Sequence, residues 1–133
     1  MPNLLFNWLL FIDRFLGERR FSYDQLLTFR FHVDAEDARP SAIDIVVEGN
    51  GIAISAPIFA QGNPMATTVA TDYRFRFSEH PSYQWIPTIS SMDFVRMLSN
   101  LTAIKIRATY TSRGSMVFKM HNKNCTRPVI YTN

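Results

Sequence analysis

The 133-residue sequence contains only one cysteine, Cys125, and three histidines, His32, His80 and His121. One cysteine cannot form an internal disulfide, a cysteine-based zinc site or a CxxC redox pair. The histidines lack the HxH or HxxxH spacing of metal ligands and are expected at the surface. We therefore expect neither a bound metal ion nor a cofactor.

Motifs for catalysis are missing as well, because the chain has no GxSxG elbow and no glycine-rich phosphate loop. Asp34, Glu36 and Asp37 cluster beside Arg39-Pro40, in a run typical of a solvated turn rather than of paired catalytic carboxylates. A triad assembled from distant residues leaves no sequence signal, so that class stays open. Taken as a whole, the sequence predicts a protein that is not an enzyme.

Long charged or apolar runs are also absent. Fourteen basic and eleven acidic residues give a formal charge of +3, and without a basic run or a base-stacking motif this excess does not indicate nucleic-acid binding. The apolar segment 4–12 is too short for a transmembrane helix, which needs ~20 residues. Its alternatives are the apolar part of a signal peptide, although no Lys or Arg precedes it, a first strand, or a short helix.

The sequence does contain strong two-residue alternation of apolar and polar side chains, which is typical of strands with one buried face. The clearest example runs from Leu27 to Val33, and the eleven Phe and five Tyr residues favour strands as well. Further alternating segments cover 43–47, 52–56, 73–77 and 104–110. The Glu-Gly-Asn-Gly run at 48–51 predicts a tight turn, so that 43–47 and 52–56 form a hairpin.

One short helix is predicted over residues 91–99, with Ser90 or Ser91 as its cap and Asp93 in its first turn. Phe94 begins a single apolar stripe along it. Many short strands, one helix and no βαβ pattern indicate an all-β fold. We expect an antiparallel β-sandwich of the jelly-roll type.

Basic residues on the outward faces of three predicted strands form a candidate binding surface. They are Arg30, His32, Arg74, Arg76, Lys105 and Arg107. If these strands are neighbours, the side chains make a basic patch able to hold sulfated glycans or an acidic protein. The simpler interpretation is an ordinary solvent face, on which they pair with Asp34, Asp44 or Glu48.

Two further features concern carbohydrate. Tyr83 and Trp85 are candidates for the aromatic platform of a carbohydrate-binding module, although a role as core or loop anchors is the better interpretation. Asn100 and Asn124 each begin an N-glycosylation triplet. Asn100 follows the predicted helix, where an acceptor is exposed.

Several separated segments resemble one protein family. They are RFLG at 14–17, FSYDQL at 21–26, FRFHVD at 29–34, VEGNGI at 47–52, IFAQGN at 58–63, YRFRFSE at 73–79, Trp85, Phe94 and LSNLTAIKIRATY at 98–110. In order and spacing, over about residues 14–112, they resemble the laminin IV type A domain (laminin domain IV). The segment AQGN and the region of Trp85 are most similar to laminin gamma chains.

The resemblance implies a jelly-roll sandwich similar to galactose-binding-like domains, with no catalytic residues. It also implies a secreted glycoprotein of the extracellular matrix, in basement membranes, where the domain is a structural module that supports matrix assembly or cell adhesion. The partners would be other matrix proteins or laminin chains, reached through the parent protein.

The predicted organisation is an apolar segment at 1–13, the laminin IV type A-like sandwich at 14–113 and a divergent segment at 114–133. Met116, Phe118 and Met120 alternate in a way compatible with a last strand, whereas the end of the chain does not resemble the family. The EGF-like cysteines that flank the family's module are absent. Two alternatives to the structural module therefore stay open: a carbohydrate- or sulfated-glycan-binding sandwich, and a truncated fragment without independent function.

Overall fold

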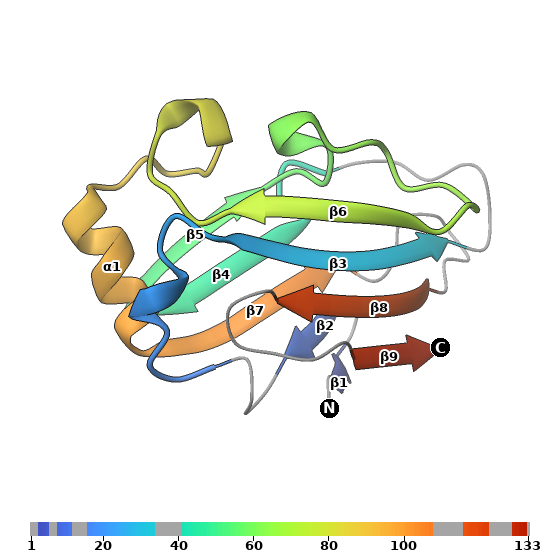
Figure 1. Cartoon of the computed structure of the whole chain (residues 1–133), viewed down its shortest axis with the longest axis horizontal. Helices are drawn as coiled ribbons and strands as arrows, with labels where there is room; N and C mark the ends of the chain where they lie inside the picture. The colour runs from blue at the N-terminus through green and yellow to red at the C-terminus, as the bar shows by residue number, and fades with distance from the viewer. Residues whose placement is uncertain are drawn as a thin grey trace.

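Two antiparallel sheets pack face to face in the computed structural model, which describes residues 3–5, 8–11, 16–33, 41–107, 116–122 and 129–132 (Figure 1). One sheet has the order β1-β2-β7-β4-β5, formed by Asn3–Leu5, Trp8–Phe11, Leu101–Arg107, Ile45–Gly49 and Ile52–Ala56. The other has the order β6-β3-β8-β9, formed by Thr71–Arg76, Leu26–Val33, Met116–Asn122 and Val129–Thr132. The predicted all-β sandwich is confirmed.

The alternating segments of the sequence form the strands of both sheets. In β3 and β6 the register places Phe29 opposite Tyr73, and both are buried, whereas the neighbouring Arg74 is exposed. Successive side chains of a strand point to opposite faces, so the polar set faces solvent. The part of the predicted strand 104–110 that follows Arg107 lies outside the described residues.

Both ends of the chain contribute strands beyond the predicted domain limits of 14 and 113. The strand β2 pairs with β7 in one sheet, and β8 lies between β3 and β9 in the other. The alternation at 116–120 therefore falls within a strand of the sandwich, and the segment 4–12 contains strands rather than a helix among its described residues.

Aromatic side chains dominate the core between the sheets. Phe29 stacks on Tyr73 at 5.5 Å between ring centroids and on Phe75 at 5.8 Å. Contacts at 5.8 to 6.3 Å continue this series through Trp85 and Phe77 to the helix residue Phe94. Such pairs stabilise beyond the area they bury. Burial also raises the pKa of the Tyr73 hydroxyl to about 12.

The helix α1, Ser91–Ser99, covers one end of the sandwich (Figure 1). Its predicted bounds are confirmed, and the Ser90 hydroxyl accepts a hydrogen bond from the Asp93 N–H at 3.1 Å, as a capping residue does. The helix buries Phe94, Met97 and Leu98. It thereby closes the open end of the aromatic core.

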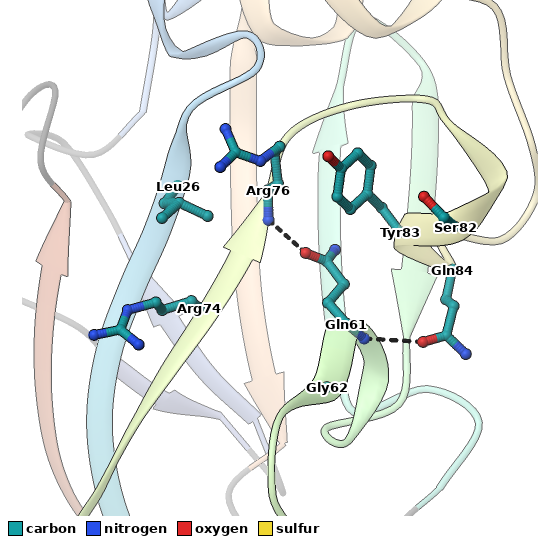
Figure 2. Close-up of a pocket in the computed structure, with 8 residues that line it drawn as sticks. All are labelled: Leu26, Gln61, Gly62, Arg74, Arg76, Ser82, Tyr83 and Gln84. Atoms are coloured by element: carbon teal, nitrogen blue, oxygen red, sulfur yellow. Dashed lines mark hydrogen bonds between the residues drawn. The ribbon is translucent and has the colours of Figure 1, made fainter.

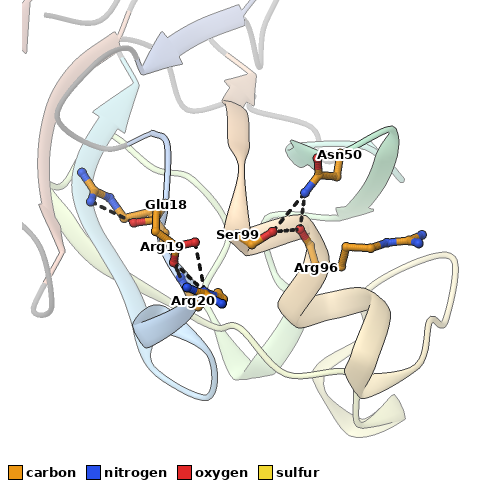
Figure 3. A network of polar contacts seen from close by, with 6 residues as sticks. All are labelled: Glu18, Arg19, Arg20, Asn50, Arg96 and Ser99. Carbon is orange, nitrogen blue, oxygen red and sulfur yellow. Dashed lines mark hydrogen bonds and ion pairs between the residues drawn. The ribbon is translucent and has the colours of Figure 1, made fainter.

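The hairpin turn between β4 and β5 holds the C-terminal end of this helix. Asn50 and Gly51 have φ values of 51° and 74°, which confirms the predicted tight turn. The Asn50 side-chain amide donates to the Arg96 carbonyl at 2.7 Å and to the Ser99 hydroxyl at 3.0 Å (Figure 3). A helix end leaves its last carbonyls without helical partners, and Asn50 supplies one.

Gly49 makes the close approach of this hairpin to the helix possible. A Cβ atom at this position would lie 2.1 Å from the Met97 carbonyl oxygen and 2.7 Å from that of Asn100. These are backbone atoms, so they cannot move away as a flexible side chain would. Only glycine fits here.

The 3₁₀ turn η2, Arg20–Ser22, lies against the same helix. The Arg19 N–H donates to the Leu98 carbonyl at 2.8 Å, and the rings of Tyr23 and Phe94 meet edge to face. The Tyr23 hydroxyl donates to the Glu79 carboxylate, which raises the pKa of Tyr23 to about 12 and lowers that of Glu79. The segment before β3 and the segment after β6 are thus joined at the helix end of the sandwich.

A fully buried carboxylate, that of Asp44, joins three segments of the first sheet. It accepts hydrogen bonds from the Ser41 N–H at 3.1 Å, the Ile58 N–H at 2.8 Å and the Arg107 Nε at 2.6 Å. The expectation that Asp44 lies on the solvent face is wrong. Asp44 precedes β4, where strand alternation does not apply, and a buried carboxylate is tolerated because donors surround it.

We predict that Asp44→Ala lowers the free energy of unfolding by about 3–5 kcal/mol, because it removes the buried carboxylate that accepts from Arg107 Nε and from the Ser41 and Ile58 N–H groups. Urea denaturation measures the difference. Asp72→Ala is the matched control, since Asp72 pairs with Arg30 at 3.9 Å on the surface, where loss of a pair costs about 1 kcal/mol or less. Equal losses in the two variants would contradict this role of Asp44.

Candidate functional site

An open cleft of about 440 Å³ lies beside the edge strand β6, next to the 3₁₀ turns η3 (Ala60–Gly62) and η4 (Pro81–Tyr83). The cleft is lined by Leu26, Gln61, Gly62, Arg74, Arg76, Ser82, Tyr83 and Gln84. Figure 2 shows the two arginine side chains on one side of it and Tyr83 and Gln84 on the other, with the Gln61 amide between them. Among the described residues, two cations and no carboxylate line the cleft, so this lining is positively charged.

Side chains replace a neighbouring strand along this part of β6. The Asn63 amide both accepts from the Arg74 N–H at 3.0 Å and donates to the Arg74 carbonyl at 2.7 Å. The Arg76 N–H donates to Gln61 Oε1 at 2.7 Å, and the Arg76 carbonyl accepts from Trp85 Nε1 at 2.8 Å. The backbone groups that an edge strand would offer to another chain are therefore already paired at both arginines.

The loops that form the far side of the cleft contain two glutamines in the left-handed region. Gln61 has a φ of 61° and Gln84 a φ of 64°, a conformation that is uncommon for residues other than glycine. The Gln61 N–H donates to Gln84 Oε1 at 2.9 Å, which joins the two loops (Figure 2). Backbone strain of this kind persists only where surrounding contacts hold it, so the loops have a defined shape.

The two arginines of the cleft differ in how far they are engaged. Arg76 Nη1 donates to the Asp24 carbonyl at 2.7 Å and lies 3.8 Å from Asp24 Oδ1. The Arg74 side chain is exposed, and within the described part of the chain no carboxylate lies within ion-pair distance of it. Arg74 is thus a cation that a ligand can reach without displacing a carboxylate.

The structure divides the predicted basic patch between the two sheets. Arg30, His32, Arg74 and Arg76 belong to β3 and β6, which are neighbours. Lys105 and Arg107 belong to β7 in the other sheet. The six residues therefore do not form one continuous surface, and only Arg74 and Arg76 line the cleft.

Described carboxylates pair with the basic residues Arg30, Lys105 and Arg107, which lie outside the cleft. Arg30 lies 3.9 Å from Asp72, and Lys105 Nζ donates to Glu48 at 3.1 Å. The side chain of Arg107 is mostly buried and pairs with Asp44. Arg30 and Lys105 therefore fit the simpler interpretation of the sequence, in which basic side chains on a solvent face pair with acidic residues across strands.

The comparisons with known proteins assign this sandwich to a family. The model of the family described as laminin B (domain IV) matches residues 10–122, which is most of the chain. The chain belongs to the laminin B (domain IV) family. The resemblance seen in the sequence is confirmed.

The curated relatives include laminin gamma subunits and a laminin-like protein. The domain IV chain is 46% identical over 102 residues to laminin subunit gamma-1 of Xenopus tropicalis and 44% identical over 102 residues to that of Homo sapiens. It is 44% identical over 100 residues to the laminin-like protein lam-2 of Caenorhabditis elegans. These alignments cover 74–77% of the chain and 6% of each relative.

A solved structure shares the fold of this laminin domain IV. The L4b domain of human laminin alpha-2 superimposes with a TM-score of 0.67 at 14% sequence identity, covering 92% of this chain and 69% of that one. At such low identity the likeness concerns the fold alone. It agrees with the antiparallel sandwich described above.

The two aromatic candidates of the domain IV module have different roles. Trp85 is 5% exposed and packs against Phe75 and Phe77, so it is a core residue. Its Nε1 also donates a hydrogen bond to the Arg76 carbonyl at the edge of β6. Tyr83 is half-buried and lines the cleft. Of the predicted aromatic platform, only Tyr83 is therefore placed where it could contact a sugar in the cleft.

Of the two glycosylation candidates of the domain IV module, one can be placed in the structure. Asn100 is exposed just after α1, while Asn124 lies outside the described residues. Among the residues that the structure describes, no group of His, Cys, Asp and Glu could hold a metal ion, and no helix is long and apolar enough to cross a membrane.

Sequence reasoning missed Gln61, Asn63 and Gln84 as residues of this site. The Gln-Gly-Asn-Pro run at 61–64 indicated a loop, which is correct, but nothing in it indicated that its amides would pair with β6. Amides next to glycine and proline near an expected edge strand are a usable signal for such pairing. Nothing in the sequence indicated Gln84, because its role depends on contact with a loop 23 residues away.

We predict that Asn63→Ala lowers the free energy of unfolding by about 1–3 kcal/mol, because the backbone groups of Arg74 lose both partners. The bared edge should also promote self-association. Urea denaturation and sedimentation velocity measure the two effects. Gln25→Ala is the control, since this exposed amide side chain makes no hydrogen bond with the described residues, and a stable, monomeric Asn63→Ala protein would contradict the role of Asn63.

Proposed function

We propose that the chain is a non-catalytic structural module of a secreted extracellular-matrix protein, and that it supports matrix assembly or cell adhesion as part of a longer laminin-like chain. The observation that carries this proposal is the family match over residues 10–122. The gamma-subunit relatives support it, because their similar segment is about a sixteenth of a much longer protein. The module would therefore act through its parent chain.

The packing suits a module that must keep its shape within a longer chain. The aromatic series from Phe29 to Phe94 runs without a break from the sheet to the helix, and Asp44 links three segments at the other side of the core. The edge of β6 at Arg74 and Arg76 is paired internally, which limits unwanted association in a crowded matrix.

A chimera tests the structural role. Residues 10–122 would replace the matching segment of human laminin subunit gamma-1, and secretion and deposition into the matrix of cultured cells would be compared with the parent. We expect deposition at the parental level, and an Asp44→Ala chimera as the destabilised control should be retained in the cell. A chimera that is secreted at the parental level but not deposited would overturn the proposal.

Glycosylation tests the secretory location separately. We predict that Asn100 carries an N-linked glycan when the chain passes through the secretory route, because this acceptor is exposed after α1. Thr102→Ala should remove the glycan, whereas Thr102→Ser keeps the triplet and should retain it. Gel mobility with and without enzymatic deglycosylation is the readout, and identical mobility of the parent and Asn100→Gln would contradict the prediction.

A further inference from the structure

We propose that the cleft beside β6 binds a short acidic oligosaccharide, whose carboxylate or sulfate group pairs with Arg74 while a sugar ring packs against Tyr83. This binding site goes beyond the structural role proposed above and does not depend on it. It rests on the charge, shape and hydrogen-bonding capacity of the residues that line the cleft.

The charge of the cleft selects an anion. Arg74 and Arg76 are among its described lining residues, none of which is a carboxylate. In Figure 2 both guanidinium groups extend on the same side of the cleft, with Leu26 beside them. Arg76 is partly engaged by Asp24, whereas Arg74 is exposed and has no acidic partner among the described residues. A guanidinium group offers paired donors that match the oxygens of a carboxylate or a sulfate.

The opposite side of the cleft suits sugar rather than an apolar ligand. Tyr83 presents a half-buried ring that packs edge to face against His80 at 6.2 Å, so the ring is held in place. Such a ring offers an apolar face and a polar hydroxyl, as a sugar ring with its own apolar face requires. The exposed Ser82 and Gln84 supply polar groups for sugar hydroxyls, and a volume of about 440 Å³ is typical of small-ligand sites.

The pairing of the β6 edge argues against an acidic peptide in the same place. A peptide that binds beside an edge strand gains most of its affinity from main-chain hydrogen bonds to that strand. Here Asn63, Gln61 and Trp85 already occupy the groups at Arg74 and Arg76 that would make those bonds. The cleft thus offers side-chain donors and an aromatic ring, without a free backbone ladder.

Loop geometry indicates that the cleft is present before a ligand arrives. The hydrogen bond between Gln61 and Gln84 joins the two loops, and both residues are held at positive φ. The side-chain oxygen of Gln61, Oε1, is also held in place, because it accepts a hydrogen bond from the Arg76 N–H. A pre-formed site loses less conformational entropy when it binds a small ligand.

The test is titration of the purified full chain by calorimetry, with oligosaccharides of equal length derived from heparin, hyaluronan and chitin. We expect binding of at least one acidic sugar and much weaker binding of the neutral chitin fragment. The first two probes distinguish a sulfate-bearing from a carboxylate-only ligand, and either supports the proposal. Equal binding of the heparin, hyaluronan and chitin fragments, or no binding of either acidic fragment, overturns the proposal.

Matched variants locate the site. Arg74→Ala should weaken binding of the acidic sugar roughly tenfold or more, since a charge-assisted hydrogen bond is lost, whereas Arg96→Ala removes the same charge from α1 and should change it little. Equal losses of affinity in the two variants would indicate a diffuse charge effect and would overturn the proposal that the cleft is the binding site. Backbone NMR shifts at Gly62, Arg74 and Gln84 should move on titration. Tighter binding of a glutamate-rich peptide than of either acidic sugar would also reject the proposal.

Discussion

The buried carboxylate of Asp44 is the constraint on which much of the first sheet depends. A charged group inside a protein needs donors on several sides, and here they come from the Ser41 and Ile58 N–H groups and from Arg107. These donors belong to the segment before β4, the segment after β5 and the end of β7. One side chain therefore sets the relative position of three parts of the chain, in the sheet that faces the aromatic series.

The hydrogen-bonding needs of backbone groups also explain where the cleft lies. The edge of β6 has N–H and carbonyl groups that need partners, and the loops around η3 and η4 bring Asn63, Gln61 and Trp85 to them. Folding the loops back onto the strand leaves a hollow between them, lined by Tyr83 and Gln84 on one side. The proposed binding site is thus a by-product of closing an edge strand, with its charge supplied by the outward residues of β6.

The strands, the hairpin and the helix could be predicted because each depends on neighbours in sequence. Leu27 to Val33 alternates, Asn50-Gly51 tolerates positive φ, and Ser90 caps α1. Two kinds of feature escaped this reasoning. Alternation puts Asp44 on the solvent face, which is wrong because Asp44 precedes β4, and the predicted basic patch spans strands that belong to different sheets.

By itself, the sequence determined the all-β class, the bounds of the helix, the turn at Asn50 and the family, because local geometry and motif order are written in the chain. Tertiary structure alone decided which strands are neighbours, and so which charges meet. It paired Arg107 with a buried Asp44, left Arg74 without an acidic partner among the described residues, and set Tyr83 across the cleft from it. The physical reason is that alternation gives the face of a residue within its strand but carries no information about the adjoining strand.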